Sequence, residues 1–552
     1  MHTQNMKTKR TIIIGGVAGG ATAAARLSRL DSKREITVLE RGPYVSFANC
    51  GLPYYIGGVI EKEDSLLLAS PQLFRERYGI EVMVRHEART IDPDRKTVSV
   101  ANLATGEEML MEYDELVLSP GASPIRPPMP GIDLPGVVTL RSVPDANTIQ
   151  SYISGHRVRR ALVIGAGFIG LEVAENLHHA GIAVSIAEGG SHVLPPLDAH
   201  MATYAREILE TNGIIVETGC IAAGIRSTAD GSLQAYNDAW SSAEVDLVVL
   251  AIGVRPETDL AQSAGLAIGE TGAILVDEHM RTSVPGIWAV GDAVQVTSRL
   301  TGKPMRLALA GVAQKQARVA ADDIVGRPAA FGGVLGTSVL RIFDTTIAMT
   351  GLNADVLARS GEKDFEYVDG HHTQHVGYYP GAAPIHARLV FSRSDGRILG
   401  YTAIGRDGAA RRVDVVAALM GHRGTVYDMA EAELCYSPQE GAAKDAVNQL
   451  GLAAVNNLTG MHPVAHRPDI RPDSYLLDVR ETAEVERAPY AGAVNIPLST
   501  LRQRLAEIPR DREILVFCQS GVRGHSATAL LNDRGFTARH LSGGYLSLVR
   551  PE

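Results

Sequence analysis

A β-branched apolar run at residues 11–14 is followed by a glycine-rich turn. The stretch "TIIIGGVAGGATAAARL" predicts a short strand, a turn and an Ala-rich helix, and "EITVLERG" predicts a second strand that ends at Glu40. Gly15, Val17 and Gly20 occupy the positions of a G-x-G-x-x-G fingerprint in which the middle glycine is replaced. The outer glycines still permit the tight turn, so a pyrophosphate could lie at the helix N-terminus and a ribose at Glu40. A glycine turn without a ligand is the alternative for one isolated motif.

The same pattern recurs in "RALVIGAGFIGLEVAENLHHAGIAVSIAEGG". Here the fingerprint is intact at Gly165, Gly167 and Gly170, and Glu188 closes a second βαβ unit. Two such units on one chain indicate two bound dinucleotides. The Glu188 carboxylate suits a ribose 2′-hydroxyl and repels a 2′-phosphate, and no arginine directly follows it, so we expect NADH rather than NADPH.

Three further predicted strands end at glycines. "YDELVLSPGASP" breaks at Gly121, and "VDLVVLAIGVRP" breaks at Gly253. "VPGIWAVGDAV" ends at Gly291 and Asp292, where a carboxylate could accept a hydrogen bond from a ribityl or ribose hydroxyl. A helix N-cap is the alternative role for Asp292. These four residues are candidates for cofactor binding.

The pattern changes after residue 330, where no third glycine turn occurs. "ARLVFSRSDGRILGYTAIG" predicts a β-hairpin with a Ser-Asp-Gly turn, and "VDVVAALMGHRGTVYDMAEAELCYSP" predicts helix. In "HHTQH", residues His371, His372 and His375 have no cysteine or acidic ligands at helical spacing. We therefore expect a solvated strand or turn there, and no metal site.

Short strands and helices alternate again near the C-terminus. "FCQSGVRG" places Cys518 directly after a predicted strand and before a predicted helix. The backbone N–H groups of residues 520–524 could converge on the sulfur, which would lower the thiol pKa and stabilise the outer sulfur of a persulfide. Arg523 adds a positive charge. Cys518 and Arg523 are therefore candidates for sulfur chemistry.

Composition sets the limits within which these motifs are interpreted. A chain of 552 residues is too long for one core, so we expect three or four domains. A net charge of -9 gives no reason to expect binding to nucleic acid or to anionic membranes. We see no membrane-spanning run and no signal peptide. The four cysteines are too few and too scattered for a disulfide framework, which favours a reducing, cytoplasmic location.

With these motifs in place, the chain resembles two known families. Up to residue 328 it is similar to the two-dinucleotide flavin disulfide reductases, and "DVR", "AGAVNIP" and the Cys518 loop resemble a rhodanese domain. The resemblance implies an α/β protein with two Rossmann-like domains, an α+β dimerisation domain and a C-terminal α/β rhodanese domain. The expected boundaries are 1–150 and 253–328 for the two parts of the FAD domain, 151–252 for the NAD(P)H domain, 329–455 for dimerisation, 456–468 for a linker and 469–552 for rhodanese.

The segment "VSFANCGLPYYIGG" contains one cysteine, Cys50, and the nearest other cysteine in sequence is Cys220. This segment resembles the active-site segment of coenzyme A-disulfide reductases, which use a single cysteine. The resemblance implies that Cys50 lies near the flavin and forms a mixed disulfide with a small thiol. The family also implies that coenzyme A contacts a set of nearby polar residues: Thr22, Arg26, Arg29, Ser46 and Asn49.

The same family implies a homodimer in which two tyrosines of the partner subunit complete the site. Tyr436 fits the family's Tyr-Ser-Pro segment, and Tyr367 fits more loosely; core packing is the alternative for either. Joined to the rhodanese resemblance, this predicts an NADH-dependent reductase of coenzyme A persulfide, other small persulfides, polysulfide or coenzyme A disulfide. An NADH oxidase or peroxidase that cycles through a Cys50 sulfenic acid is the first alternative. A redox-sensing binding protein is the second.

Overall fold

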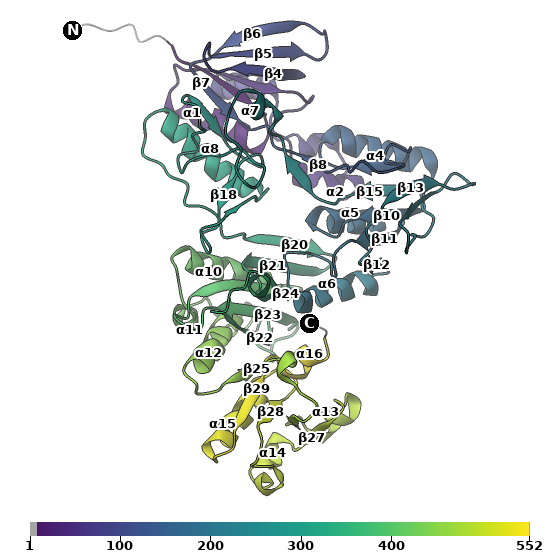
Figure 1. The fold of residues 1–552 in the computed structure, drawn as a ribbon, viewed down its shortest axis with the longest axis vertical. Helices are drawn as coiled ribbons and strands as arrows, with labels where there is room; N and C mark the ends of the chain where they lie inside the picture. The colour runs from purple at the N-terminus through teal and green to yellow at the C-terminus, as the bar shows by residue number, and fades with distance from the viewer. Residues whose placement is uncertain (1–7, 551–552) are drawn as a thin grey trace, which may run out of the picture. The chain divides into compact units, whose positions relative to one another are not determined.

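The computed structural model describes residues 8–550, which form two units (Figure 1). The first unit contains the chain up to Gly189 together with Cys220–Val334, and the second contains Gly190–Gly219 together with the chain from Leu335 onward. Within the described residues, no helix is long and apolar enough to cross a lipid bilayer.

A parallel sheet in the order β17-β7-β1-β2-β3 forms the core of the first dinucleotide domain. Its strands are β1 (Arg10–Ile14), β2 (Glu35–Glu40), β3 (Glu81–Val84), β7 (Glu115–Leu118) and β17 (Ile287–Ala289). The isoleucines of β1 are buried, as expected of a central parallel strand. Helices α1 (Ala18–Leu30) and α8 (Ala310–Ile324) pack on one another. Because β17 returns to this sheet from far along the chain, the domain is built from two separated segments.

A second parallel sheet carries the other glycine turn. Its strands β11 (Ala183–Glu188), β10 (Arg160–Ile164), β15 (Leu247–Leu250) and β9 (Val137–Thr139) lie in that order, and α5 (Phe168–His179) follows the turn. The remaining elements of this unit are η1 (Asn49–Gly51), α2 (Leu52–Ile56), η2 (Glu63–Leu66), α3 (Pro71–Tyr78), β4 (His86–Asp92), β5 (Thr97–Asn102), β6 (Glu108–Glu112), β8 (Ala122–Pro124), α4 (Val143–His156), β13 (Gly224–Ser227), β14 (Leu233–Tyr236), β16 (Val254–Pro256), α7 (Asp259–Ser263), β18 (Val296–Thr297) and β19 (Pro304–Met305).

The second unit contains an antiparallel sheet in the order β20-β21-β24-β23-β22. The strands of this sheet are β20 (Ser338–Ile342), β21 (Thr345–Gly351), β22 (Glu366–Thr373), β23 (Pro384–Phe391) and β24 (Ile398–Gly405). Outside this sheet and the C-terminal domain, the unit contains α6 (Ala199–Thr211), β12 (Ile215–Thr218), α9 (Ala354–Arg359), α10 (Ala409–Gly421), α11 (Val426–Glu431) and α12 (Ala446–Leu458). The predicted hairpin is β23–β24. The predicted helical stretch is interrupted between α10 and α11, because Arg423 has a positive φ of 61° and a Cβ on Gly424 would lie 2.9 Å from the Leu419 carbonyl oxygen.

The histidines of "HHTQH" differ from their prediction. His371 and His372 lie on β22, where burial lowers the pKa of His371 to about 3 and that of His372 to about 4. His375 is also buried. The expectation of a solvated segment was wrong, because this polar sequence is covered by other elements of the unit.

The C-terminal domain of this unit is a parallel sheet in the order β25-β29-β28-β26-β27. Its elements are β25 (Val464–Ala465), η3 (Arg467–Asp469), β26 (Tyr475–Asp478), α13 (Thr482–Arg487), β27 (Ala493–Asn495), α14 (Leu498–Leu501), η4 (Leu505–Glu507), β28 (Ile514–Phe517), α15 (Val522–Asp533), β29 (Ala538–Leu541) and α16 (Gly544–Leu548). The stretch predicted as a linker begins inside α12 and includes β25, so only part of it is irregular.

Candidate functional site

The first glycine turn is closed by contacts that only glycine allows. Gly15 has a φ of 96°, and a Cβ there would lie 2.0 Å from the carbonyl oxygen of Ser119. A Cβ on Gly20 would lie 1.8 Å from the Gly15 carbonyl oxygen. Val17 is the N-cap residue of α1 and gives the helix no side-chain cap. The first N–H groups of α1 are therefore left for an external anion such as a pyrophosphate.

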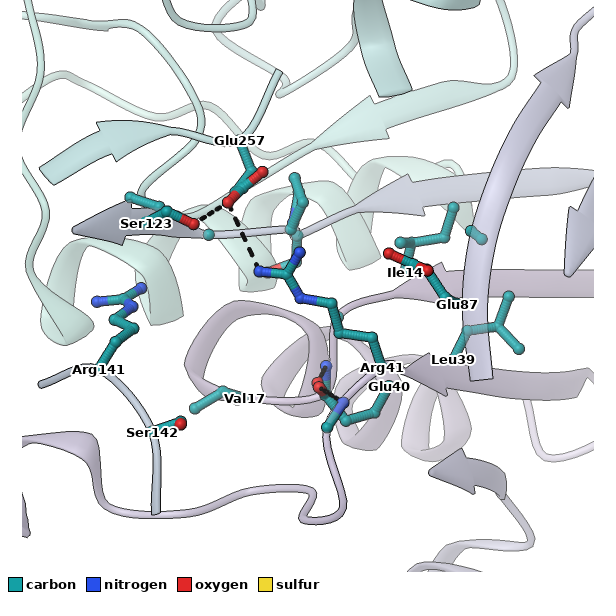
Figure 2. A pocket seen from close by; sticks show the side chains of 18 of the residues that line it. Ile14, Val17, Leu39, Glu40, Arg41, Glu87, Ser123, Arg141, Ser142 and Glu257 are labelled. Atoms are coloured by element: carbon teal, nitrogen blue, oxygen red, sulfur yellow. Dashed lines mark hydrogen bonds and ion pairs between the residues drawn. The ribbon is translucent and has the colours of Figure 1, made fainter. Parts of the chain in front are cut away.

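A cavity of about 830 Å³ lies over this turn (Figure 2). The Glu40 carboxylate accepts hydrogen bonds from the backbone N–H groups of Gly16 and Gly42, each at 2.8 Å, which fixes it at the cavity wall. On the opposite side, Glu257 accepts a hydrogen bond from Ser123 and pairs with Arg41 at 3.5 Å. The volume, the glycine turn and the fixed carboxylate fit FAD.

The other predicted cofactor residues divide into two groups. Gly121 lines the cavity, and a Cβ there would lie 3.2 Å from Arg141 Nη2. Arg141 Nη2 donates to Asp292 Oδ2 at 3.0 Å, and Gly291 has a φ of 86°. Asp292 caps no helix, so the N-cap alternative is wrong. Gly253, with a φ of 112°, is absent from the cavity lining, as are Gly291 and Asp292; the Gly253 carbonyl oxygen accepts a hydrogen bond from the Ile125 backbone N–H.

The second glycine turn repeats the first closely. A Cβ on Gly165 would lie 2.5 Å from the Ala251 carbonyl oxygen, and a Cβ on Gly170 would lie 2.0 Å from the Gly165 carbonyl oxygen. A Cβ on Gly167 would meet no protein atom within 4 Å, so the chain here faces open space. Glu188 Oε2 accepts a hydrogen bond from Ala166 N at 2.7 Å, as Glu40 does in the first turn. This arrangement suits a second dinucleotide.

Cys50 lies in η1, between the glycine turn and α2. Ser46 N donates to the Gly16 carbonyl oxygen at 2.8 Å, which ties the cysteine segment to the turn, and Asn49 lines the cavity. The Asn49 side-chain oxygen accepts hydrogen bonds from Cys50 N at 3.1 Å and from Cys50 Sγ at 3.7 Å. None of the four cysteines, all within the described residues, forms a disulfide, and Cys50 is exposed. Any disulfide at Cys50 must therefore form with a molecule from outside this chain.

The surroundings of Cys50 within one chain disfavour the thiolate. The sulfur is accessible, but crowding by protein atoms raises the pKa of Cys50, and the carboxylates of Glu172 and Asp292 raise it further, while Arg141 lowers it. Glu172, on α5, was not singled out in the sequence. Burial raises the pKa of Glu172 to about 7, and Tyr54 donates a hydrogen bond to its Oε1 at 3.3 Å.

The arginines predicted to contact coenzyme A have different partners. Arg26 donates to Asp322 Oδ1 from Nη2 at 2.6 Å and from Nε at 3.0 Å, so its charge is paired inside the chain. Arg29 is exposed and lies 5.9 Å from the ring centroid of Tyr78. Thr22 is partly buried on the same helix.

The structure separates the two predicted tyrosines. Tyr436 is exposed, and its hydroxyl lies 3.3 Å from that of Tyr378, which is 75% exposed. Tyr367 is on β22, where its ring stacks on His466 at 3.8 Å and lies under the Arg388 guanidinium at 4.2 Å. The ring of Tyr367 is therefore packed inside its own chain, and Tyr378, which the sequence analysis does not single out, is the exposed tyrosine beside Tyr436.

Cys518 follows β28 at the start of a backbone cradle. Its side chain is buried, and Gly521 N donates to Sγ at 3.2 Å. Gly521 has a φ of 108°, which turns that N–H toward the sulfur. Tyr545 N, in α16, donates to the Cys518 carbonyl oxygen at 2.7 Å and holds the loop from behind. Arg523 extends from the first turn of α15, and both of its Nη atoms donate to Glu484.

Comparisons with known proteins agree with this architecture. Residues 9–317 match the model for pyridine nucleotide-disulphide oxidoreductases, residues 338–446 match the dimerisation domain of that family, and residues 465–550 match the rhodanese-like domain. A coenzyme A disulfide reductase of Staphylococcus haemolyticus (strain JCSC1435) is 33% identical over 447 residues, which cover 81% of this chain and 99% of that protein.

Two solved structures are similar over nearly the whole chain. Reduced Bacillus anthracis CoADR-RHD is 40% identical, with a TM-score of 0.96, and the match covers 98% of both chains. An NAD-dependent persulfide reductase from A. fulgidus is 36% identical, with a TM-score of 0.92, and the match covers 98% of this chain and 99% of that one.

Two dinucleotide folds in series and two separate thiol sites define a pyridine nucleotide-dependent oxidoreductase with a rhodanese module. The chain belongs to the pyridine nucleotide-disulphide oxidoreductases, in the family of coenzyme A-disulfide and persulfide reductases that carry a C-terminal rhodanese domain. This confirms the predicted family and fold class, and it implies the use of FAD and NAD(P)H.

Proposed function

We propose that this protein uses NADH to reduce coenzyme A persulfide, other small persulfides, polysulfide or coenzyme A disulfide, through FAD and Cys50. The observation that carries the proposal is the accessible Cys50 thiol, which is tied to the glycine turn of the FAD cavity and has no cysteine partner in its own chain. Its oxidised form is then a mixed disulfide with a small thiol. The Cys518 cradle supplies a second place where sulfane sulfur is held.

The sulfur steps balance without any further reactant. The Cys50 thiolate attacks the inner sulfur of a persulfide, R–S–SH; the S–S bond breaks, HS⁻ leaves, and the mixed disulfide Cys50–S–S–R forms. FAD, held by the Gly15–Gly20 turn and Glu40, would supply the two-electron chemistry that links NADH to this disulfide, which is reduced to the Cys50 thiolate and RS⁻. Overall, one persulfide, one NADH and one proton give one thiol, one hydrogen sulfide and NAD⁺.

The Cys50 thiolate needs stabilising groups from outside its own chain. In a homodimer, Tyr436 of the partner subunit and Tyr378 of the partner subunit would supply hydroxyls for this role, and Tyr378 replaces Tyr367 in our assignment. The support is that the two hydroxyls lie 3.3 Å apart on an exposed face. Hydrogen bonds to a charged acceptor stabilise it by about 1.5–3 kcal/mol, which acts against the carboxylates near Cys50.

Substrate binding is assigned to the residues around the cysteine segment. Arg29 would bind the anionic phosphates of coenzyme A, with Thr22, Ser46 and Asn49 nearby. Arg26 is paired with Asp322, so it would contribute to coenzyme A binding only through that ion pair. Glu188 underlies the proposed preference for NADH. A cytoplasmic, reducing location fits a chain whose four described cysteines form no disulfide.

The test is anaerobic oxidation of NADH and NADPH with a panel of acceptors. The panel contains coenzyme A persulfide, glutathione persulfide, polysulfide and coenzyme A disulfide, with oxygen and hydrogen peroxide as separate arms. The proposal predicts fast turnover with the sulfur acceptors and a preference for NADH. Fast turnover with peroxide or oxygen alone would instead support the oxidase or peroxidase alternative, and no turnover with any acceptor would support a sensor.

A further inference from the structure

The cation at the rhodanese loop is neutralised by a carboxylate. Arg523 Nη1 and Nη2 donate to the two oxygens of Glu484 at 2.6 and 2.7 Å, which is a bidentate pair. Glu484 also accepts a hydrogen bond from Glu481 N at 3.0 Å, so its carboxylate is held from both sides. The hydrogen bonds from Arg523 lower the pKa of Glu484 to about 2, so this carboxylate stays ionised in all ordinary buffers.

The second guanidinium beside the loop is neutralised as well. Arg480 is fully buried and donates to both oxygens of Asp478, the closest contact being 2.6 Å from Nη2. Its Nη1 lies 3.5 Å from the side-chain oxygen of Gln519, and its guanidinium lies 4.1 Å from the Tyr545 ring. In contrast to these paired charges, the Val522 side chain, on the loop itself, is 61% exposed. The accessible surface here therefore carries the apolar Val522 and one compensated cation, Arg523, while the compensated Arg480 is buried.

We propose that Glu484 determines the donor specificity of the Cys518 site. By neutralising Arg523, it disfavours small donors with two negative charges, of which thiosulfate is the probe, and it leaves the site to persulfides whose organic group packs on Val522. This inference rests on the proposed transfer of sulfane sulfur at Cys518. Glu484 touches neither donor nor sulfur in this assignment; it acts through Arg523 and is a positioning residue.

The transfer step itself is balanced. The Cys518 thiolate attacks the outer sulfur of R–S–SH, the S–S bond breaks, and RS⁻ leaves with the electron pair. The product is the Cys518 persulfide, whose outer sulfur can accept hydrogen bonds from the loop N–H groups, beginning with that of Gly521. With thiosulfate the leaving group would be sulfite, and its two charges would need an uncompensated cation that the paired Arg523 does not provide.

The experiment compares kcat/KM for two sulfur donors, the persulfide of an alkyl thiol without charged groups and thiosulfate, with cyanide as acceptor, in the full chain. The wild type is expected to prefer the persulfide. Glu484→Gln, which removes the charge but keeps the shape, should raise kcat/KM for thiosulfate at least tenfold and change that for the persulfide less than threefold. Glu481→Gln, which removes a neighbouring carboxylate that does not pair with Arg523, is the matched control. Glu484→Asp retains the charge and should stay close to the wild type.

A second readout separates this role from simple loss of structure. Freed Arg523 should bind the thiosulfate dianion, so the gain for thiosulfate in Glu484→Gln should appear as a lower KM at a nearly unchanged kcat, whereas a loss of structure would lower kcat for both donors. A wild type that uses thiosulfate as well as persulfide overturns the inference, even if the variants fail to fold. So does a Glu484→Gln variant whose two donor activities fall together. If the wild type transfers sulfur from neither donor while NADH-driven turnover at Cys50 persists, it is the proposed sulfurtransferase role that fails.

Discussion

Because His200 on α6 is buried, we predict a measurable loss of folding stability in acid. Neither ring nitrogen of His200 has a hydrogen-bond partner among the described residues, and the side chain is 2% exposed. Burial lowers its pKa from 6.5 to about 4. Because the folded-state pKa lies below the unfolded one, the stability contribution of neutral His200 is complete above pH 6.5 and is lost as the pH falls toward 4. Linkage gives a loss of about 2 kcal/mol from this residue between pH 8 and pH 5.

The perturbation is His200→Leu, which has similar volume and no titratable group. At pH 8 the variant should be more stable by about 1 kcal/mol, because two buried, unbonded ring nitrogens are removed. Between pH 8 and pH 5 it should lose about 2 kcal/mol less than the wild type. The assay is hydrogen exchange of α6 and β23 peptides, corrected for intrinsic rates, at both pH values. His422→Leu, at an exposed position of the same unit, is the control. An unchanged pH dependence in His200→Leu would refute the reasoning.

Three other substitutions test the site. Gly167→Ala should keep FAD and the fold but raise KM for NADH by about tenfold, roughly 1.4 kcal/mol, since its Cβ would enter only the space left for the ligand; equal KM values would contradict this. Glu172→Gln should lower the pH midpoint for alkylation of Cys50, because the Glu172 carboxylate raises the pKa of Cys50; a midpoint that rises or stays would count against that electrostatic picture. Tyr378→Phe should reduce sulfur-dependent turnover by at least about tenfold, because a hydrogen bond of about 1.5 kcal/mol to the Cys50 thiolate is lost. Tyr367→Phe is its control: the variant retains the ring contacts and should leave turnover unchanged. The reverse order would restore Tyr367 to the site.

The features that could be predicted from sequence are those set by nearby residues. The glycine turns are one case: Gly20 must be glycine because its Cβ would meet the Gly15 carbonyl oxygen five positions away. The strand and helix around each turn follow from the same short stretch. Cys518 is another case, because its strand, loop and helix lie within one contiguous segment.

The features that were missed depend on contacts between distant segments. Arg141 meets Asp292 across 151 positions, so no local pattern could place a guanidinium at the cavity. Glu172 influences Cys50 because α5 packs on α2. This contact brings a carboxylate of the second dinucleotide domain to the thiol of the first. Tyr367 fits the family segment only loosely in sequence, and no local pattern shows that its ring on β22 stacks on His466, 99 positions further along the chain.

The central claim is that Cys50 alone carries electrons to external sulfur. The direct measurement is anaerobic: NADH consumed and hydrogen sulfide released from coenzyme A persulfide, glutathione persulfide and polysulfide, in the wild type and in Cys50→Ser, Cys435→Ser and Cys518→Ser. The account predicts one hydrogen sulfide per NADH in the wild type, none in Cys50→Ser, full turnover in Cys435→Ser, and impairment with only some sulfur donors in Cys518→Ser. Sustained release of hydrogen sulfide by Cys50→Ser would contradict it.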